Sequence, residues 1–141
     1  MFTQLQTLKQ NIAKEMELYH LYNVVPSLFN FIEDLTNWYI RLNRRRFWEE
    51  GLKDDKKSAY STLYTAILEL TTALAPFAPF LSEYIYQELK ALGGLTEESI
   101  HLCTYPEAKQ EYINPVLEDA VDRMQQIILL GRQKRNQIQI K

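Results

Sequence analysis

The chain has 141 residues, of which 46% are hydrophobic and 24% charged, and its formal net charge is −2. This balance excludes a disordered or low-complexity chain and predicts one ordinary domain over residues 1–141. The single cysteine, Cys103, excludes an intramolecular disulfide and lacks the set of neighbouring Cys or His ligands that a zinc site requires. His20 and His101 stand apart from any constellation of reactive groups, so we expect no catalytic and no metal-binding residue.

No apolar run approaches the ~18 residues of a membrane span. The N-terminal segment MFTQLQTLKQ lacks the apolar core of a secretory signal. We therefore expect a cytoplasmic protein that makes no membrane contact.

Apolar residues recur at steps of three and four from Leu5 to Tyr19 and again from Leu21 to Leu42, which predicts two amphipathic helices. On a helical wheel, one face of the second helix forms an apolar stripe about 120° wide. The residues of this stripe are Leu28, Phe31, Ile32, Leu35, Trp38, Tyr39 and Leu42.

Three more helices are predicted further along the chain. The third carries the repeat from Tyr60 to Leu74, with Asp54 or Asp55 as its N-cap, and the Pro76/Pro79 pair closes it. The fourth runs from Phe80 to Leu89 and stops at Gly93-Gly94. The last begins at Asn114-Pro115 and presents one apolar face. That face comprises Leu117, Ala120, Val121, Met124, Ile127, Ile128 and Gly131.

The segment at about 93–113 breaks the helical pattern and is expected to be a long crossover. Its short apolar stretch from Ile100 to Cys103 could form an extended piece. Each predicted helix has an apolar stripe that its neighbours must cover, so the fold class is all-α, an antiparallel bundle of about five helices.

A basic cluster follows the second stripe in the segment NWYIRLNRRRFWEEG, residues 37–51. On the wheel, Arg41 and Arg44 project away from the stripe and Arg45 borders it. Arg46 would point back into the stripe, which predicts either that the helix ends there or that Arg46 forms a buried ion pair.

Two interpretations of this cluster are open. Cations near a helix C-terminus are favourable by themselves, and Glu49 and Glu50 stand four residues after Arg45 and Arg46 as possible surface partners. The alternative is a phosphate-binding patch, in which Trp48 either stacks on an unpaired base or anchors the edge of the core.

A second basic stretch, GRQKRNQIQIK at residues 131–141, contains Arg132, Lys134, Arg135 and Lys141 and no acidic residue. Two basic clusters near helix ends are more typical of an RNA-binding protein than one is.

The amino-acid sequences of several segments resemble those of a known family. These segments are FIEDLTNWYIRLNRRRFW (31–48), AYSTLYTAILELTTALAPFAPFLSEYIYQEL (59–89), SIHLCTYPEA (99–108) and the closing GRQKRNQIQIK. Together they resemble the anticodon-binding domain of isoleucyl-tRNA synthetase, of the class I group for Ile, Val, Leu and Met, over essentially the whole chain. The most specific part of this resemblance is the pair of motifs NWYIRxxRRRFW and APFxPFLxE.

The resemblance implies an excised fragment of a larger enzyme. In the family, the bundle follows a catalytic domain whose HIGH and KMSKS signatures bind ATP with Mg²⁺, and neither signature occurs in these 141 residues. We therefore expect no catalysis and no cofactor in this chain itself. The remaining synthetase domains, which would carry the ATP chemistry, are expected to be its partners in cis.

The implied function is to hold the anticodon stem-loop of tRNA(Ile) while the parent enzyme attaches isoleucine. By position, the resemblance implies a set of residues that face the RNA. They are Arg41, Asn43, Arg44, Arg45 and Trp48, followed by Lys56, Lys57, Arg132, Lys134 and Arg135. Two alternatives stay open: a helical protein-interaction module with a basic end, and the equivalent domain of the valyl or leucyl enzyme.

Overall fold

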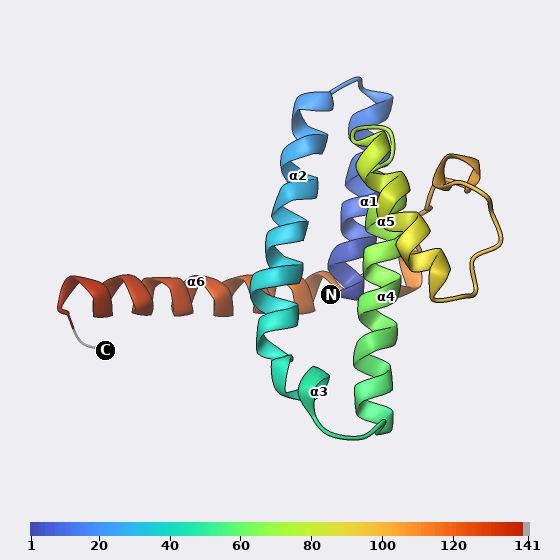
Figure 1. Cartoon of the computed structure of the whole chain (residues 1–141). Helices are drawn as coiled ribbons and strands as arrows, with labels where there is room; N and C mark the ends of the chain where they lie inside the picture. Colours follow the sequence, from blue (N-terminus) through green and yellow to red (C-terminus); the bar gives the residue numbers. More distant parts are fainter. Residues whose placement is uncertain (140–141) are drawn as a thin grey trace.

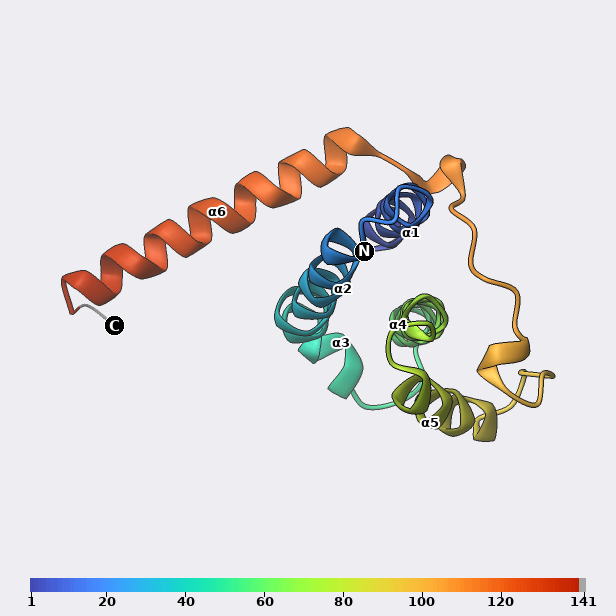
Figure 2. The same ribbon diagram turned by 90° about the horizontal axis from the view of Figure 1, so that it is seen from above.

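The computed structural model describes residues 1–139 and contains helices and turns but no strand within that range. The helices α1 (Phe2–Glu17), α2 (Leu21–Asp34), α4 (Asp54–Leu74) and α5 (Pro79–Ala91) alternate in direction, and α6 (Pro115–Gln137) runs across them (Figure 1). In the view from above, α4 lies between α5 and the α1–α2 pair, and α6 extends away from the bundle (Figure 2). The predicted all-α antiparallel bundle is confirmed. None of these helices is long and apolar enough to cross a membrane within the described residues.

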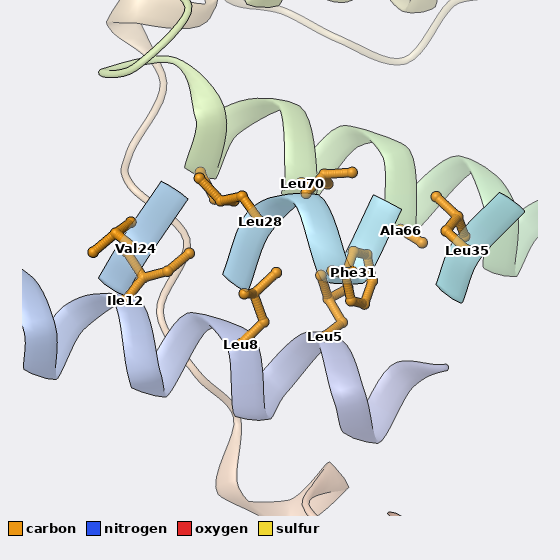
Figure 3. Close-up of a cluster of buried hydrophobic side chains, with 10 residues drawn as sticks. Leu5, Leu8, Ile12, Val24, Leu28, Phe31, Leu35, Ala66 and Leu70 are labelled. Atoms are coloured by element: carbon orange, nitrogen blue, oxygen red, sulfur yellow. The ribbon is translucent and has the colours of Figure 1, made fainter. Parts of the chain in front are cut away.

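The main core lies where α1, α2 and α4 meet. Leu5 and Ile12 of α1 are fully buried, as are Val24 of α2 and Ala66 of α4, and Figure 3 shows their side chains converging from the three helices. An ion pair between a buried lysine and a half-buried glutamate supports the same interface, because Nζ of Lys9 lies 2.6 Å from a carboxylate oxygen of Glu69 on α4. The three helices therefore share the main hydrophobic core of the domain.

The second predicted helix is divided in the structure. α2 continues into a π-helix, η1 (Leu35–Ile40), and after a turn at Asn43 the short helix α3 (Arg44–Trp48) begins in a new direction. The described residues therefore form six α-helices instead of about five. The division places Arg44, Arg45 and Arg46 on a separate helix from the buried stripe of α2, while Arg41 stays at the end of η1.

The ends of α4 and α5 follow local sequence signals. Lys53 is the N-cap of α4, so Asp54 and Asp55 occupy its first turn instead of capping it as predicted. Pro79 starts α5, and Gly93 follows the helix with a φ of +95°, a backbone conformation that favours glycine. The predicted stop at Gly93 is therefore confirmed.

The crossover contains two short 3₁₀ turns, η2 (Ile100–Leu102) and η3 (Gln110–Tyr112), so the extended piece predicted at Ile100–Cys103 is wrong. The reason is a carboxylate on α5. Glu83 accepts hydrogen bonds from the Ser99 hydroxyl at 2.7 Å and from the Ile100 backbone N–H at 3.0 Å. These bonds hold Ile100 in a tight turn, where it packs in a second small core with Ala75 and Tyr86.

α6 starts as predicted, because the side chain of Asn114 accepts a hydrogen bond from the Leu117 backbone N–H at 3.1 Å. Its predicted apolar face is not covered, since none of its described residues is buried. Only the first half of α6 crosses the bundle, where Thr7 donates a hydrogen bond of 2.9 Å to Glu118. The second half projects beyond α2 (Figures 1 and 2).

Candidate nucleic-acid interface

The corner between η1 and α3 is organised by Asn43. Its amide nitrogen donates to the Tyr39 carbonyl at 2.8 Å, and its amide oxygen accepts from Nη1 of Arg46 at 3.0 Å. Its backbone carbonyl also accepts the first hydrogen bonds of α3, from Arg46 and Phe47. Both ends of the side chain therefore serve the corner itself, and a contact of Asn43 with RNA stays a prediction.

Arg46 lies beyond the end of the second predicted helix, in α3, and forms an ion pair there. Its Nε and Nη2 atoms lie 2.7 Å and 2.6 Å from the two carboxylate oxygens of Asp55, and Nη2 also donates to the Asp55 carbonyl at 3.2 Å. The hydrogen bonds from Arg46 lower the pKa of Asp55. The side chain of Arg46 remains 36% exposed, so the pair is not buried. Arg46 is the member of the cluster whose charge is already matched.

The other three arginines are available to a partner. Arg41, Arg44 and Arg45 are exposed, and within residues 1–139 none of them forms an ion pair or a side-chain hydrogen bond. The surface pairs that sequence spacing suggested with Glu49 and Glu50 are not formed. Glu49 pairs with Lys53 instead, which lowers the pKa of the Glu49 carboxyl.

Trp48 lies next to these arginines and adds an exposed aromatic ring to the same surface. Its side chain is 70% exposed, so the interpretation as an anchor at the core edge is wrong. The guanidinium carbon of Arg44 lies 4.1 Å from the centre of the Trp48 ring, which is a cation–π contact. Trp38, by contrast, is half-buried and faces α6, where Arg132 lies 5.8 Å from its ring centre.

The two lysines predicted for the interface lie beside α3 at the start of α4. Lys56 donates to the Glu49 carbonyl at 2.8 Å, and Lys57 pairs with Asp54 at 3.3 Å. Their charges are thus partly used locally, and they add less to the positive potential than the three unpaired arginines do. Tyr60, one turn further on, was assigned to the core stripe from sequence but is 46% exposed beside the cluster.

The second basic cluster is carried by the projecting half of α6. Arg132, Lys134 and Arg135 are exposed, and Lys134 and Arg135 have no ion-pair partner in the described part of the chain. Lys141 lies outside the described residues. Figure 1 shows α3 at one end of the bundle and α6 extending sideways from it, so the two clusters flank one side of the molecule.

A hollow of different character lies elsewhere on the molecule. It has a volume of about 750 Å³ between α1, α2 and the start of α6, and its charged lining residues are three carboxylates, Asp34, Glu118 and Asp122, and one cation, Lys14. Burial and then the nearby charge of Asp122 raise the pKa of Asp34, so this hollow concentrates negative charge. A polyanion would be repelled from it. We therefore assign the candidate interface to the two basic clusters.

A helical bundle with two exposed basic clusters and an accessible tryptophan has the features of an RNA-binding domain. Comparison with known families agrees, because residues 1–141 match the model of the anticodon-binding domain of tRNA ligases. The chain belongs to this family.

Individual relatives are isoleucine–tRNA ligases. The chain is 45% identical to the enzyme of Bdellovibrio bacteriovorus over 99% of its length and 47% identical to the cytoplasmic enzyme of Saccharomyces cerevisiae over 93%. It is 39% identical to the Clostridium acetobutylicum enzyme over 99% of its length. The matched region spans 13% of the first two relatives and 14% of the third.

Proposed function

We propose that this domain holds the anticodon stem-loop of tRNA(Ile) for an isoleucyl-tRNA synthetase. Support comes from the family match together with one structural observation. Arg41, Arg44 and Arg45 expose unpaired guanidinium groups beside Trp48 at one end of the bundle. Such groups neutralise phosphates and fix the register of a bound RNA, while an exposed aromatic ring can stack on an unpaired base.

The α6 cluster gives the proposal a second contact region. An RNA hairpin between α3 and α6 would meet Arg41, Arg44 and Arg45 on one side and Arg132, Lys134 and Arg135 on the other. Lys56, Lys57 and Asn43 would line the α3 side with smaller contributions, because their polar groups already have partners within the protein.

The chemistry of the whole enzyme belongs to the same proposal. Isoleucine would be activated with ATP and Mg²⁺ in a catalytic domain elsewhere in the polypeptide, and the bundle would act only through tRNA placement. A cytoplasmic location is proposed with it, in line with the name of the yeast relative.

The test is a titration of the chain with a labelled anticodon stem-loop of tRNA(Ile), at low and moderate salt. About five phosphate contacts predict that log affinity falls with log salt with a slope of roughly −3.5 to −4.5. The same stem carrying a valine anticodon tests discrimination, and an Arg41→Ala/Arg44→Ala double variant tests the arginine cluster.

Preferential binding that weakens steeply with salt and is lost in the double variant supports the proposal. Binding of both hairpins with equal affinity, unaffected by the double variant, would assign discrimination to other parts of the enzyme. A protein-interaction module would bind no hairpin, and its affinity for a protein partner would depend less on salt.

A further inference from the structure

A cleft of about 280 Å³ opens beside the arginine cluster, between the end of η1, α3 and the first half of α4. Phe47 and Leu63 form its apolar floor, and Arg41, Arg44 and Trp48 surround its mouth. Small-molecule pockets begin at roughly 300 Å³, so the cleft has room for about one flat ring system.

The walls of the cleft are held by aromatic contacts. The rings of Phe47 and Tyr60 meet edge to face with centres 5.1 Å apart, and Tyr39 meets Phe47 in the same way at 6.2 Å. The Tyr60 hydroxyl donates to the Phe47 carbonyl at 3.3 Å. The cleft is therefore preformed, and an entering ring would meet walls that need little ordering.

The polar side chains at the cleft are nearly all donors. Arg41 and Arg44 carry only N–H donors, and the residues that line the cleft include no carboxylate and no amide side chain. A ligand that fits must therefore have apolar faces and must present hydrogen-bond acceptors along one edge.

Arg44 is already placed to read such an edge. Its guanidinium carbon lies 4.1 Å from the centre of the Trp48 ring, and its N–H groups form no hydrogen bond within residues 1–139, so they are free to donate to a ligand. Two parallel N–H donors match the adjacent O6 and N7 acceptors of guanine. Adenine places an N–H₂ donor beside N7 and cannot accept both bonds.

We infer that this cleft takes one unpaired guanine of the bound RNA loop, with Arg44 donating to O6 and N7. Arg41 neutralises a phosphate next to that nucleotide. The inference rests on the proposed function and deepens it, because it names the base and the side chain that reads it.

The probes are RNA hairpins with a common stem and an adenine loop, in which one loop position at a time carries guanine, inosine or 7-deazaguanine. Inosine retains O6 and N7, so it should bind as tightly as guanine. Adenine and 7-deazaguanine lose one of the two acceptors and should bind about 5- to 150-fold more weakly at the responsive position. A Trp38→Phe variant leaves Trp48 as the only tryptophan. Its fluorescence should change only with the tightly binding loops.

Two neighbouring arginines supply matched variants. Arg44→Gln should abolish the preference for guanine over adenine, whereas Arg45→Gln, one residue further along α3 and outside the cleft lining, should keep it. Both variants lose one positive charge, so a general electrostatic effect would lower their affinities equally. Circular dichroism melts verify that both remain folded.

The possible outcomes distinguish failure of the guanine-site hypothesis from failure of the proposed function. Salt-sensitive binding with no preference among the loops, and no change in Trp48 fluorescence, overturns the guanine site while RNA binding stands. A guanine preference that survives Arg44→Gln overturns the assignment of Arg44. Failure of every hairpin to bind, the tRNA(Ile) stem-loop included, overturns the proposed function and the guanine site together.

Discussion

At the scale of single residues, the contact between Arg46 and Asp55 determines how much positive charge the arginine cluster offers. Asp55 accepts hydrogen bonds at both carboxylate oxygens from Arg46, while Arg41, Arg44 and Arg45 have no such partner in the described chain. One arginine thus fixes the start of α4 to α3, and three remain for a ligand. The cluster combines a structural and a binding role in adjacent residues.

Asp55→Asn should therefore change stability and RNA affinity in opposite directions. Removing the carboxylate frees Arg46 and should tighten hairpin binding, but it also removes the clamp between α3 and α4 and should lower the melting temperature by a small amount. Titration and thermal melts measure the two effects. Glu50→Gln is the control, because it removes one negative charge next to α3, and Glu50 has no hydrogen-bond or ion-pair partner within residues 1–139. Equal tightening in both variants would mean that net charge alone governs binding.

The same pair has a defined pH dependence. The pKa of Asp55 is lowered from its ordinary value of 3.8, so the folded state binds this proton more weakly than the unfolded chain does. The contribution to stability is present above pH 3.8 and is lost as the pH falls through the lower folded pKa. The difference in melting temperature between wild type and Asp55→Asn should thus shrink below that pH.

At the scale of elements, the π-helix η1 changes which residues of the second predicted helix face the core. A π-helix turns by less than the roughly 100° per residue of an α-helix. The side chains after Leu35 are therefore rotated less far around the helix axis than an α-helical wheel predicts. Tyr39 still reaches α4, where its hydroxyl donates to the Ala59 carbonyl at 3.3 Å. Leu42 rotates out of the stripe and is 64% exposed.

Leu35→Ala and Leu42→Ala test this rotation with the same chemical change. Leu35 is 4% exposed, and its truncation should lower the free energy of unfolding by about 2–5 kcal/mol. Leu42→Ala should stay within about 0.5 kcal/mol of wild type. Chemical denaturation measures both. A large loss for Leu42→Ala would show that the uninterrupted α-helical wheel describes this segment better.

These elements also show what could be predicted from sequence. The stripes of α1, α2 and α4 have a strong period and were predicted well, since Leu5, Leu28 and Leu70 are buried as expected. The π-helix gives no periodic signal of its own, so the exposure of Leu42 was not anticipated. The turn at Ile100 depends on Glu83 of α5, a contact between segments that local sequence does not encode.

The arginine cluster was found from sequence, but the sequence did not show which of its arginines form an ion pair within the protein. Spacing pointed to Glu49 and Glu50 as partners, whereas the turn at Asn43 directs Arg46 to Asp55 on α4. The cleft beside Arg44 also needed three dimensions, because Tyr60 and Leu63 reach it from a different helix.

At the scale of the whole molecule, the position of α6 against the bundle is sensitive to charge. Asp34 of α2 has a pKa raised above 3.8, first by burial and then by Asp122 of α6. The folded state therefore holds this proton more tightly than the unfolded chain, and stability falls as the pH rises from 3.8 through the raised pKa. The cost is present in full at neutral pH.

Asp34→Asn should remove that cost. The melting temperature at neutral pH should rise on the order of 1–3 °C, because solvent screens this partly exposed group, and the gain should vanish below the ordinary pKa. Glu33→Gln is the control, since its carboxylate is exposed and affects Asp34 less than Asp122 does. A pH-independent effect of Asp34→Asn would indicate changed packing instead of a removed charge.

The projecting half of α6 provides the last prediction. Substituting Arg132, Lys134 and Arg135 by glutamine should leave the melting temperature nearly unchanged, because α6 has no buried residue in the described structure. If all three contact phosphates, the salt slope of hairpin binding should become shallower by about 2 to 3, since each contact contributes roughly 0.7 to 0.9.

A matched triple variant separates position from net charge. Lys14, Lys109 and Arg123 are exposed cations outside both basic clusters, and their change to glutamine alters the net charge equally. If RNA lies between α3 and α6, this control keeps its salt slope while the α6 variant loses part of it. Equal slopes in all three proteins would confine RNA binding to the α3 end, and α6 would then act only as a connecting helix.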